Sequence, residues 1–88
     1  MRAIKLSEHA KKGLKLLRKE SPNLAAKLWD FILNIDDTPY DGLGHPKPLR
    51  NNLSGAYSRD LDKKHRLVYQ VTEDEIQIIS CYGHYDDK

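Results

Sequence analysis

The side chains with the greatest chemical capability in this 88-residue sequence recur in its second half. Arginine, histidine and tyrosine alternate there, above all in the segments 57–59, 65–69 and 82–85. Arginine can hold phosphate oxygens in a planar fork, and histidine can exchange a proton near neutral pH. Tyrosine offers a ring face on which an unpaired base can stack. Together these residue types predict chemistry on RNA.

Positive charge is concentrated in the middle of the chain, although the formal net charge is only +2. Residues 42–66 carry a net charge of +4, whereas residues 67–88 carry −4. The cations of the middle segment are Lys47, Arg50, Arg59, Lys63, Lys64 and Arg66. A field of this sign attracts a polyanion, although a solvated basic loop accounts for the charge alone equally well.

Length and composition limit the class of protein. A chain of 88 residues is expected to form one domain, residues 1–88, around one modest core. The single cysteine, Cys81, excludes an internal disulfide and fits a reducing compartment. The N-terminus has no apolar run typical of a signal peptide or a membrane span. We therefore expect a cytoplasmic protein without membrane contact.

Hydrophobic periodicity predicts the elements that position these side chains. A short strand is expected over residues 3–6, followed by helices over residues 8–19 and 22–36, with Ser7 and Ser21 as N-caps and Pro22 in the first turn. Residues 37–53 are expected to be mostly irregular. The period then becomes two, which predicts strands over residues 56–61, 65–71 and 75–82. The result is an α+β domain, in which an N-terminal strand and a helical hairpin pack on one face of a twisted antiparallel sheet.

Several motifs resemble those of the YoeB/Txe toxins, which belong to the RelE superfamily and to bacterial toxin–antitoxin pairs. The motifs are Asn52-Leu53-Ser54-Gly55, Tyr57-Ser58-Arg59, His65-Arg66-Leu67-Val68-Tyr69 and His84-Tyr85. Their order and spacing carry the resemblance, which extends over nearly the whole chain. It implies a RelE-like, microbial-RNase-like fold and a ribosome-dependent mRNA endonuclease that cuts in the A site and so inhibits translation. It also implies a cognate YefM-like antitoxin, and a homodimer is expected by the same analogy.

The chemistry that this resemblance implies needs neither metal nor cofactor, because the RNA 2′-OH itself attacks the adjacent phosphate. By similarity, Arg66 would hold the phosphate, His84 would be the general acid and Tyr85 would orient the substrate. Further contacts to RNA are expected from Arg50, Arg59, His45, Tyr57, Lys63 and Lys64.

One position departs from the family pattern. The usual general base is a glutamate in a Pro-Glu-Pro-Leu segment, whereas this chain has Lys47 between two prolines. Three outcomes are open: like-charged neighbours could deprotonate Lys47, His45 could supply the base, or Lys47 could remain a cation that stabilises the phosphate during slower cleavage. Lesser departures are Asp60, where relatives often have a second basic residue, and the tail of residues 86–88.

Each of these roles has a structural alternative. Arg66 could pair with a carboxylate on a neighbouring strand, and His84 could be an ordinary exposed histidine. His65 begins a strand and is expected to be structural or to face RNA. Cys81 and His84 lie three positions apart and would point to opposite faces of a strand, which argues against a nucleophile and its base. A zinc site from Cys81 and the histidines lacks the usual paired spacing.

Two other classes of function stay open. The first is a catalytically weakened protein that only binds its antitoxin and acts as a co-repressor, for which Lys47 is the supporting feature. The second is a gyrase inhibitor similar to ParE, which shares the fold but acts on a protein. The pair His84 and Tyr85, following Arg66, argues against the second class because a gyrase inhibitor needs no acid for RNA cleavage.

Overall fold

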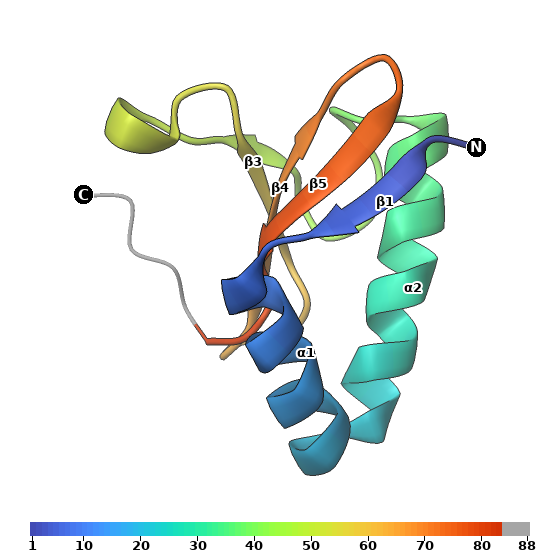
Figure 1. Cartoon of the computed structure of the whole chain (residues 1–88), viewed down its shortest axis with the longest axis vertical. Coiled ribbons are helices and arrows are strands. Elements are labelled where there is room, and N and C mark those ends of the chain that lie inside the picture. Colours follow the sequence, from blue (N-terminus) through green and yellow to red (C-terminus); the bar gives the residue numbers. More distant parts are fainter. Residues whose placement is uncertain (84–88) are drawn as a thin grey trace.

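The computed structural model describes residues 1–83, which form five strands and two α-helices (Figure 1). In chain order the elements are β1 (Ala3–Leu6), α1 (Glu8–Glu20), α2 (Pro22–Asp37), β2 (Lys47–Pro48), a short 3₁₀ turn η1 (Asn51–Leu53), β3 (Tyr57–Asp60), β4 (Arg66–Val71) and β5 (Glu75–Ser80). The helices and strands expected from periodicity are confirmed, with ends within two residues of those predicted. Strand β2 lies inside the segment that was expected to be mostly irregular.

The strands form one sheet in the order β1-β5-β4-β3-β2. Strands β2 to β5 pair antiparallel, whereas β1 lies parallel to β5, with Ala3 opposite Glu75 and Leu6 opposite Ile78. The predicted α+β fold is confirmed, and β1 makes the sheet mixed. Pro48 is tolerated in β2 because β2 is an edge strand, where a residue without a backbone N–H costs no ladder bond.

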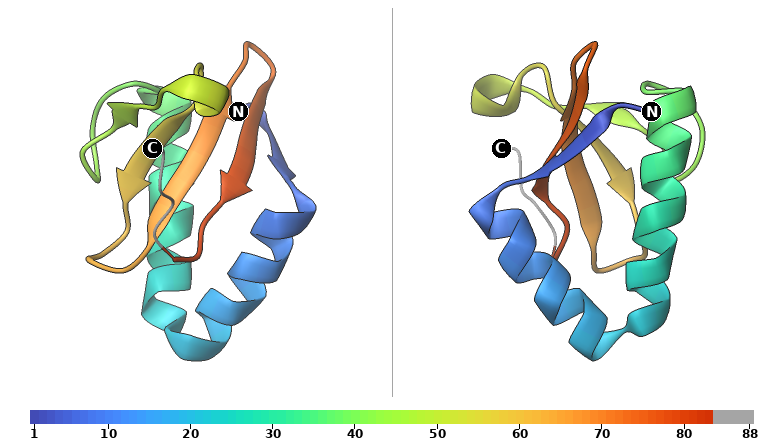
Figure 2. Two further views of the ribbon diagram at one scale, coloured as in Figure 1. Left: turned by 90° about the vertical axis from the view of Figure 1, so that its left-hand side faces the viewer. Right: turned by 45° about the vertical axis from the view of Figure 1, so that its right-hand side comes forward.

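The two helices meet at a tight turn and form a V over one face of the sheet (Figures 1 and 2). Ser7 begins α1 as predicted, since its side chain accepts a bond from the N–H of Ala10 at 3.0 Å. Ser21 precedes α2, but its side chain makes no capping bond. Its carbonyl instead accepts from the N–H groups of Leu24 and Ala25, and Pro22 has no N–H to satisfy.

The main core lies between the helices and the sheet. Its fully buried members include Leu17, Leu28, Ile32, Ile35, Leu67, Tyr69, Ile76 and Ile78. A smaller apolar cluster on the opposite face is formed by Leu49, Ala56 and Val68, with Leu53 and Ile79 packed against it. We call this opposite side the helix-free face; the segment around η1 covers part of it.

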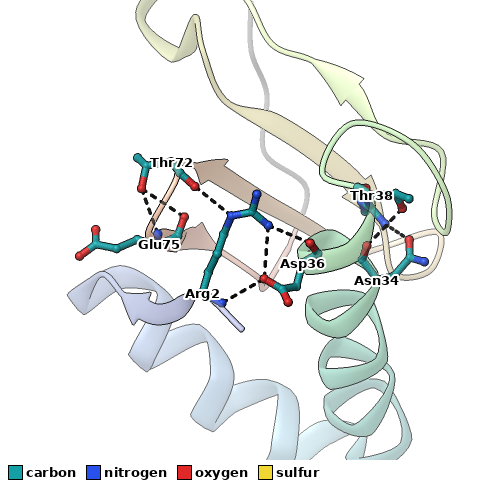
Figure 3. A network of polar contacts seen from close by, with 7 residues as sticks. Arg2, Asn34, Asp36, Thr38, Thr72 and Glu75 are labelled. Atoms are coloured by element: carbon teal, nitrogen blue, oxygen red, sulfur yellow. Dashed lines mark hydrogen bonds and ion pairs between the residues drawn. The ribbon is translucent and has the colours of Figure 1, made fainter.

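Arg2 fastens β1 to the end of α2 and to the β4–β5 turn (Figure 3). Its backbone N–H donates to Oδ1 of Asp36 at 3.0 Å, and its guanidinium donates to the carbonyls of Asp36 and Thr72 at 2.8 and 3.0 Å. Neither helix has the length and apolarity that crossing a bilayer requires, within residues 1–83.

Candidate active site on the helix-free face

Strand register places Lys47 and Arg66 on the same face of the sheet. Lys47 pairs with Ser58, and Asp60 pairs with Arg66. Paired residues of an antiparallel ladder point to one face, and residues two apart on a strand share a face. Since Tyr57, next to Ser58, packs toward the helices, all four of these side chains belong to the helix-free face. Lys47 and Arg66 therefore lie on opposite sides of β3, two strand spacings and two residues apart, or roughly 12 Å between backbones.

Arg66 makes an ion pair with Asp60 across β3 and β4. Its Nε donates to Oδ1 of Asp60 at 3.1 Å, and the side chains are 23% and 38% exposed. The structural alternative weighed for Arg66, a carboxylate partner on a neighbouring strand, is thus present. The pair engages only Nε, however, and the two terminal guanidinium nitrogens have no hydrogen-bond partner among residues 1–83. These nitrogens are the pair that an arginine uses to hold two oxygens of a phosphate.

His45 lies at the same end of β3. The N–H of Asp60 donates to the carbonyl of Gly44 at 2.7 Å, which holds the loop before β2 against this strand. His45 and Asp60 both line an open pocket of about 540 Å³, together with Lys63 and with apolar side chains of α2 and the loop, such as Phe31. Asp60 therefore has the loop that carries His45 on one side and Arg66 of β4 on the other.

The side chain of Lys47 is exposed on edge strand β2 and has no hydrogen bond or ion pair with the part of the chain that the structure describes. One expected outcome, deprotonation of Lys47, requires several arginines close to it. Arg59 is not one of them, because it points to the other face of the sheet. The other two outcomes are that His45 supplies the general base and that Lys47 stays a cation beside the phosphate.

The expected RNA contact of Arg59 is wrong, because Arg59 is fully buried on the helix side of β3. Its Nε donates to the hydroxyl of Tyr69 at 3.0 Å, and NH1 donates to Oδ1 of Asn34 at 2.6 Å. The guanidinium also donates to three backbone carbonyls, those of Thr38, Asp41 and Leu43. Figure 3 shows Asn34 and Thr38 at the end of α2, where this network lies. Arg59 thus organises the loop between α2 and β2 and has no donor left for RNA.

Tyr57 also faces the helix side, contrary to its expected role in binding RNA on the helix-free face. Its ring lies 4.8 Å from that of Tyr40 and 6.3 Å from that of Tyr69, measured between ring centroids. Alternation along β3 explains the result, because Tyr57 and Arg59 share one face while Ser58 and Asp60 share the other.

The remaining predicted cations, Arg50, Lys63 and Lys64, are exposed. The last two lie in the β3–β4 turn, where Oδ1 of Asp62 accepts from the N–H groups of Lys64 and His65 at 2.8 and 2.7 Å. Desolvation raises the pKa of Asp62, but these backbone bonds outweigh it and the net shift is below the ordinary value. The turn keeps both lysines close to Arg66.

The chain after β5 returns to the start of β4. The N–H of Arg66 donates to the carbonyl of Gly83 at 3.0 Å, and the N–H of Gly83 donates to Nδ1 of His65 at 2.8 Å. His84 and Tyr85, the expected acid and orienting group, lie outside the described residues. His65 is 7% exposed and therefore structural, one of its two expected roles. The hydrogen bond between His65 and Gly83 could not be predicted, because spacing in a sequence does not reveal a contact across 18 residues.

Two of the weaker alternatives receive no support from residues 1–83. Cys81 is buried and burial raises the pKa of its thiol to about 11, so it is a poor nucleophile near neutral pH. No three His, Cys, Asp or Glu side chains within these residues gather in a group that could hold a metal ion.

Comparison with known proteins adds to this geometry. The family described as YoeB-like toxin of bacterial type II toxin–antitoxin system matches residues 7–85. Toxin YoeB of Escherichia coli strain K12 is 44% identical over 62 residues, which cover 70% of this chain and 74% of that protein. The solved YoeB dimer from Staphylococcus aureus is 34% identical, has a TM-score of 0.88 and covers 96% of this chain and 98% of its own.

A further similar structure is the heterotetrameric YoeB–YefM toxin–antitoxin complex from Staphylococcus aureus. It is 34% identical to this chain with a TM-score of 0.87, and the match covers 97% of this chain and 99% of that chain. The similarity thus extends over the whole described fold, including the strands that carry Lys47 and Arg66.

Proposed function

Because this chain belongs to the YoeB-like toxins of bacterial type II toxin–antitoxin systems, we propose that it cleaves mRNA in the A site of the ribosome. The observation that carries the proposal is the row of side chains at one end of the helix-free face. Asp60 and Arg66 pair there across β3 and β4, Lys47 lies on the same face on the other side of β3, and the carbonyl of Gly83 accepts the N–H of Arg66. His84 and Tyr85 follow Gly83 directly in the chain.

In the proposed reaction, the 2′-OH loses its proton and its oxygen attacks the adjacent phosphorus. The bond from phosphorus to the 5′ oxygen of the next nucleotide breaks, which leaves a 2′,3′-cyclic phosphate and a 5′-OH. Arg66 stabilises the extra negative charge on the phosphate with its two terminal nitrogens, since Asp60 occupies only Nε. His84 donates the proton to the leaving oxygen, and Tyr85 orients the nucleotide.

Lys47 is assigned as a second cation beside Arg66, with His45 as the group that takes the 2′ proton. Both are exposed, Lys47 on edge strand β2 and His45 in the loop that precedes it. Lys63 and Lys64, in the β3–β4 turn, and Arg50, before η1, contribute phosphate contacts along the strand of mRNA.

This assignment predicts the effect of substitutions at position 47. Lys47→Ala should lower the single-turnover rate of cleavage about 10-fold or more, because one cation near the phosphorane is lost. Lys47→Glu should lower the rate as well, since a carboxylate there opposes the phosphate charge. His45→Ala should lower it by ~10²-fold. The rate is measured on programmed ribosomes in excess toxin, with Lys12→Glu on the exposed face of α1 as the control for the change of charge.

The opposite result has a clear meaning. If the wild type does not cleave and Lys47→Glu does, the chain lacks a general base because lysine stands at position 47. The chain would then be the weakened, antitoxin-binding protein instead of an enzyme.

We further propose that a YefM-like antitoxin neutralises the chain by covering the helix-free face, and that the chain acts in the cytoplasm as one domain and as a homodimer. The support is that similar proteins of Staphylococcus aureus are solved as a YoeB dimer and as a YoeB–YefM complex. The exposed cations Lys47, Arg50, Lys63 and Lys64 suit an acidic segment of such a partner.

The proposed function is tested by mapping new mRNA 5′ ends after adding the purified chain to translating ribosomes, with the same mRNA free of ribosomes as the control. Cuts inside the A-site codon that require the ribosome are the expected result. Intact mRNA with inhibited supercoiling by gyrase would point to the ParE-like activity. Intact mRNA and intact gyrase activity, with tight binding of the antitoxin, would point to the binding-only role.

A further inference from the structure

The segment that follows β5 is held by contacts that the proposed reaction does not use. Cys81 is buried, and its Sγ donates to the carbonyl of Ala10 at 3.5 Å. The hydroxyl of Tyr82 donates to a carboxylate oxygen of Glu20 at the end of α1. Gly13 permits this close approach, because a Cβ there would lie 3.0 Å from Cβ of Tyr82. Helix α1 therefore fixes one side of the segment.

His65 fixes its other side. The ring of His65 lies 4.7 Å from that of Tyr82, between centroids, and its Nδ1 accepts the N–H of Gly83 at 2.8 Å. The N–H of Arg66 donates to the carbonyl of the same glycine at 3.0 Å. Both backbone groups of Gly83 are thus bonded by two consecutive residues at the start of β4. His65 is itself held, since its N–H donates to Oδ1 of Asp62 at 2.7 Å.

The role of Nδ1 as an acceptor fixes the tautomer of the ring. An acceptor nitrogen carries no proton, so the neutral imidazole of His65 has its proton on Nε2. Only the ring nitrogen attached to Cγ reaches Gly83. An asparagine side chain can present its carbonyl oxygen at this same position, whereas a phenylalanine keeps the ring against Tyr82 and has no acceptor.

We infer that His65 is a positioning residue, whose Nδ1 anchors Gly83 beside Arg66 and so fixes where the segment carrying His84 and Tyr85 begins. The catalytic consequence rests on the proposed function, whereas the anchor itself does not. Misplacing a reacting group by about 1 Å can lower a rate by as much as 10²-fold. Releasing the start of this segment should therefore lower the rate of cleavage.

The anchor is tested by amide hydrogen exchange and by ¹⁵N spectra of the histidine rings, using the full chain as wild type, His65→Asn and His65→Phe. The wild-type spectrum should show the Nε2–H tautomer for His65. Exchange at Gly83 should be about 10-fold faster or more in His65→Phe and close to wild type in His65→Asn, while the amides of Leu67 and Ile78 stay protected in all three. Protection of those core amides shows that each variant is folded.

The positioning role is tested by single-turnover cleavage on ribosomes with the same proteins. The cleavage rate of His65→Phe should be about one tenth of the wild-type rate or lower. His65→Asn should recover most of the wild-type rate. Unchanged exchange at Gly83 in His65→Phe would overturn the anchor. A wild-type rate in a His65→Phe protein whose Gly83 is released would overturn the positioning role. Absence of cleavage by every protein, wild type included, would overturn the proposed function and with it the positioning role, while exchange at Gly83 would still decide the anchor.

Discussion

At the scale of single residues, Arg59 and Arg66, seven positions apart in the chain, show how the face of a strand on which a side chain lies decides its role. Arg59 satisfies carbonyls of Thr38, Asp41 and Leu43 and is fully buried. Arg66 keeps two nitrogens without a partner among residues 1–83 and is part-exposed. The first arginine builds the loop that leads to β2, and the second is available to phosphate.

Replacing Arg59 should therefore destabilise the fold. Arg59→Lys cannot bond Tyr69, Asn34 and the loop carbonyls together, and several buried polar groups would be left unpaired, each costing roughly 1–3 kcal/mol. We expect a loss of at least about 3 kcal/mol in the free energy of unfolding, measured by urea denaturation. Arg50→Lys, at an exposed position, is the matched control and should change stability by less than about 0.5 kcal/mol. Equal stability of Arg59→Lys and wild type would contradict the structural role.

The family could be predicted from residue types and their order, but the faces of the strand on which Tyr57 and Arg59 lie could not. The motif Tyr57-Ser58-Arg59 identified a strand near the site. Its alternation did not say which set of side chains faces the helices, because both sets contain polar residues. Burial of an arginine by backbone carbonyls leaves no periodic signal in a sequence. The packing of Tyr57 against the main core and the burial of Arg59 supplied the answer.

At the scale of elements, the two helices and the strands β1, β3, β4 and β5 could be predicted from periodicity and capping, whereas β2 could not. A strand of two residues that ends in Pro48 carries no periodic pattern. What fixes β2 is tertiary: the loop before it is held by Arg59 and by the bond from Asp60 to the carbonyl of Gly44. The strand that presents Lys47 therefore depends on contacts made far from it in sequence.

Gly44 is a residue of this loop with little freedom to change. Its φ is +78°, and a Cβ there would lie 2.5 Å from the ring of Phe31. Gly44→Ala should lower stability by about 2 kcal/mol or more and displace β2, and so lower cleavage as well. Gly55→Ala is the matched control, because φ is +96° there but the nearest atom, on the flexible side chain of Gln70, lies 3.5 Å away. Equal losses of stability in both variants would show that backbone strain alone, and not contact with Phe31, makes Gly44 necessary.

At the scale of the whole molecule, β1 is the edge strand opposite to β2, and Arg2 holds β1 to α2. The hydrogen bond from the backbone N–H of Arg2 to the Asp36 carboxylate is the main reason that the pKa of Asp36 lies below its ordinary value. Nearby positive charge makes smaller contributions. A carboxyl whose pKa is lower in the folded state contributes stability above its unfolded pKa and loses that contribution as the pH falls through its folded pKa.

Acid unfolding should report this contact. The thermal midpoint of the wild type should exceed that of Asp36→Asn at neutral pH. The difference should shrink as the pH falls below about 4, the ordinary pKa of an aspartate, and on through the lower pKa of Asp36 in the folded state. Asp37→Asn, one position on and exposed, is the control and should follow the wild type. A difference between wild type and Asp36→Asn that is the same at pH about 2 and at neutral pH would mean that charge at Asp36 does not contribute.

The central claim is that the helix-free face is an mRNA-cleaving site built around Arg66, and the single-turnover rate of cleavage on programmed ribosomes tests it most directly. The wild type should cut inside the A-site codon, and Arg66→Ala should cut at least ~10²-fold more slowly while its thermal midpoint remains close to that of wild type. Arg18→Ala, which removes an exposed arginine of α1, should cut like the wild type. Cleavage by Arg66→Ala at the wild-type rate, or ribosomal mRNA left intact by the wild type, would contradict the account.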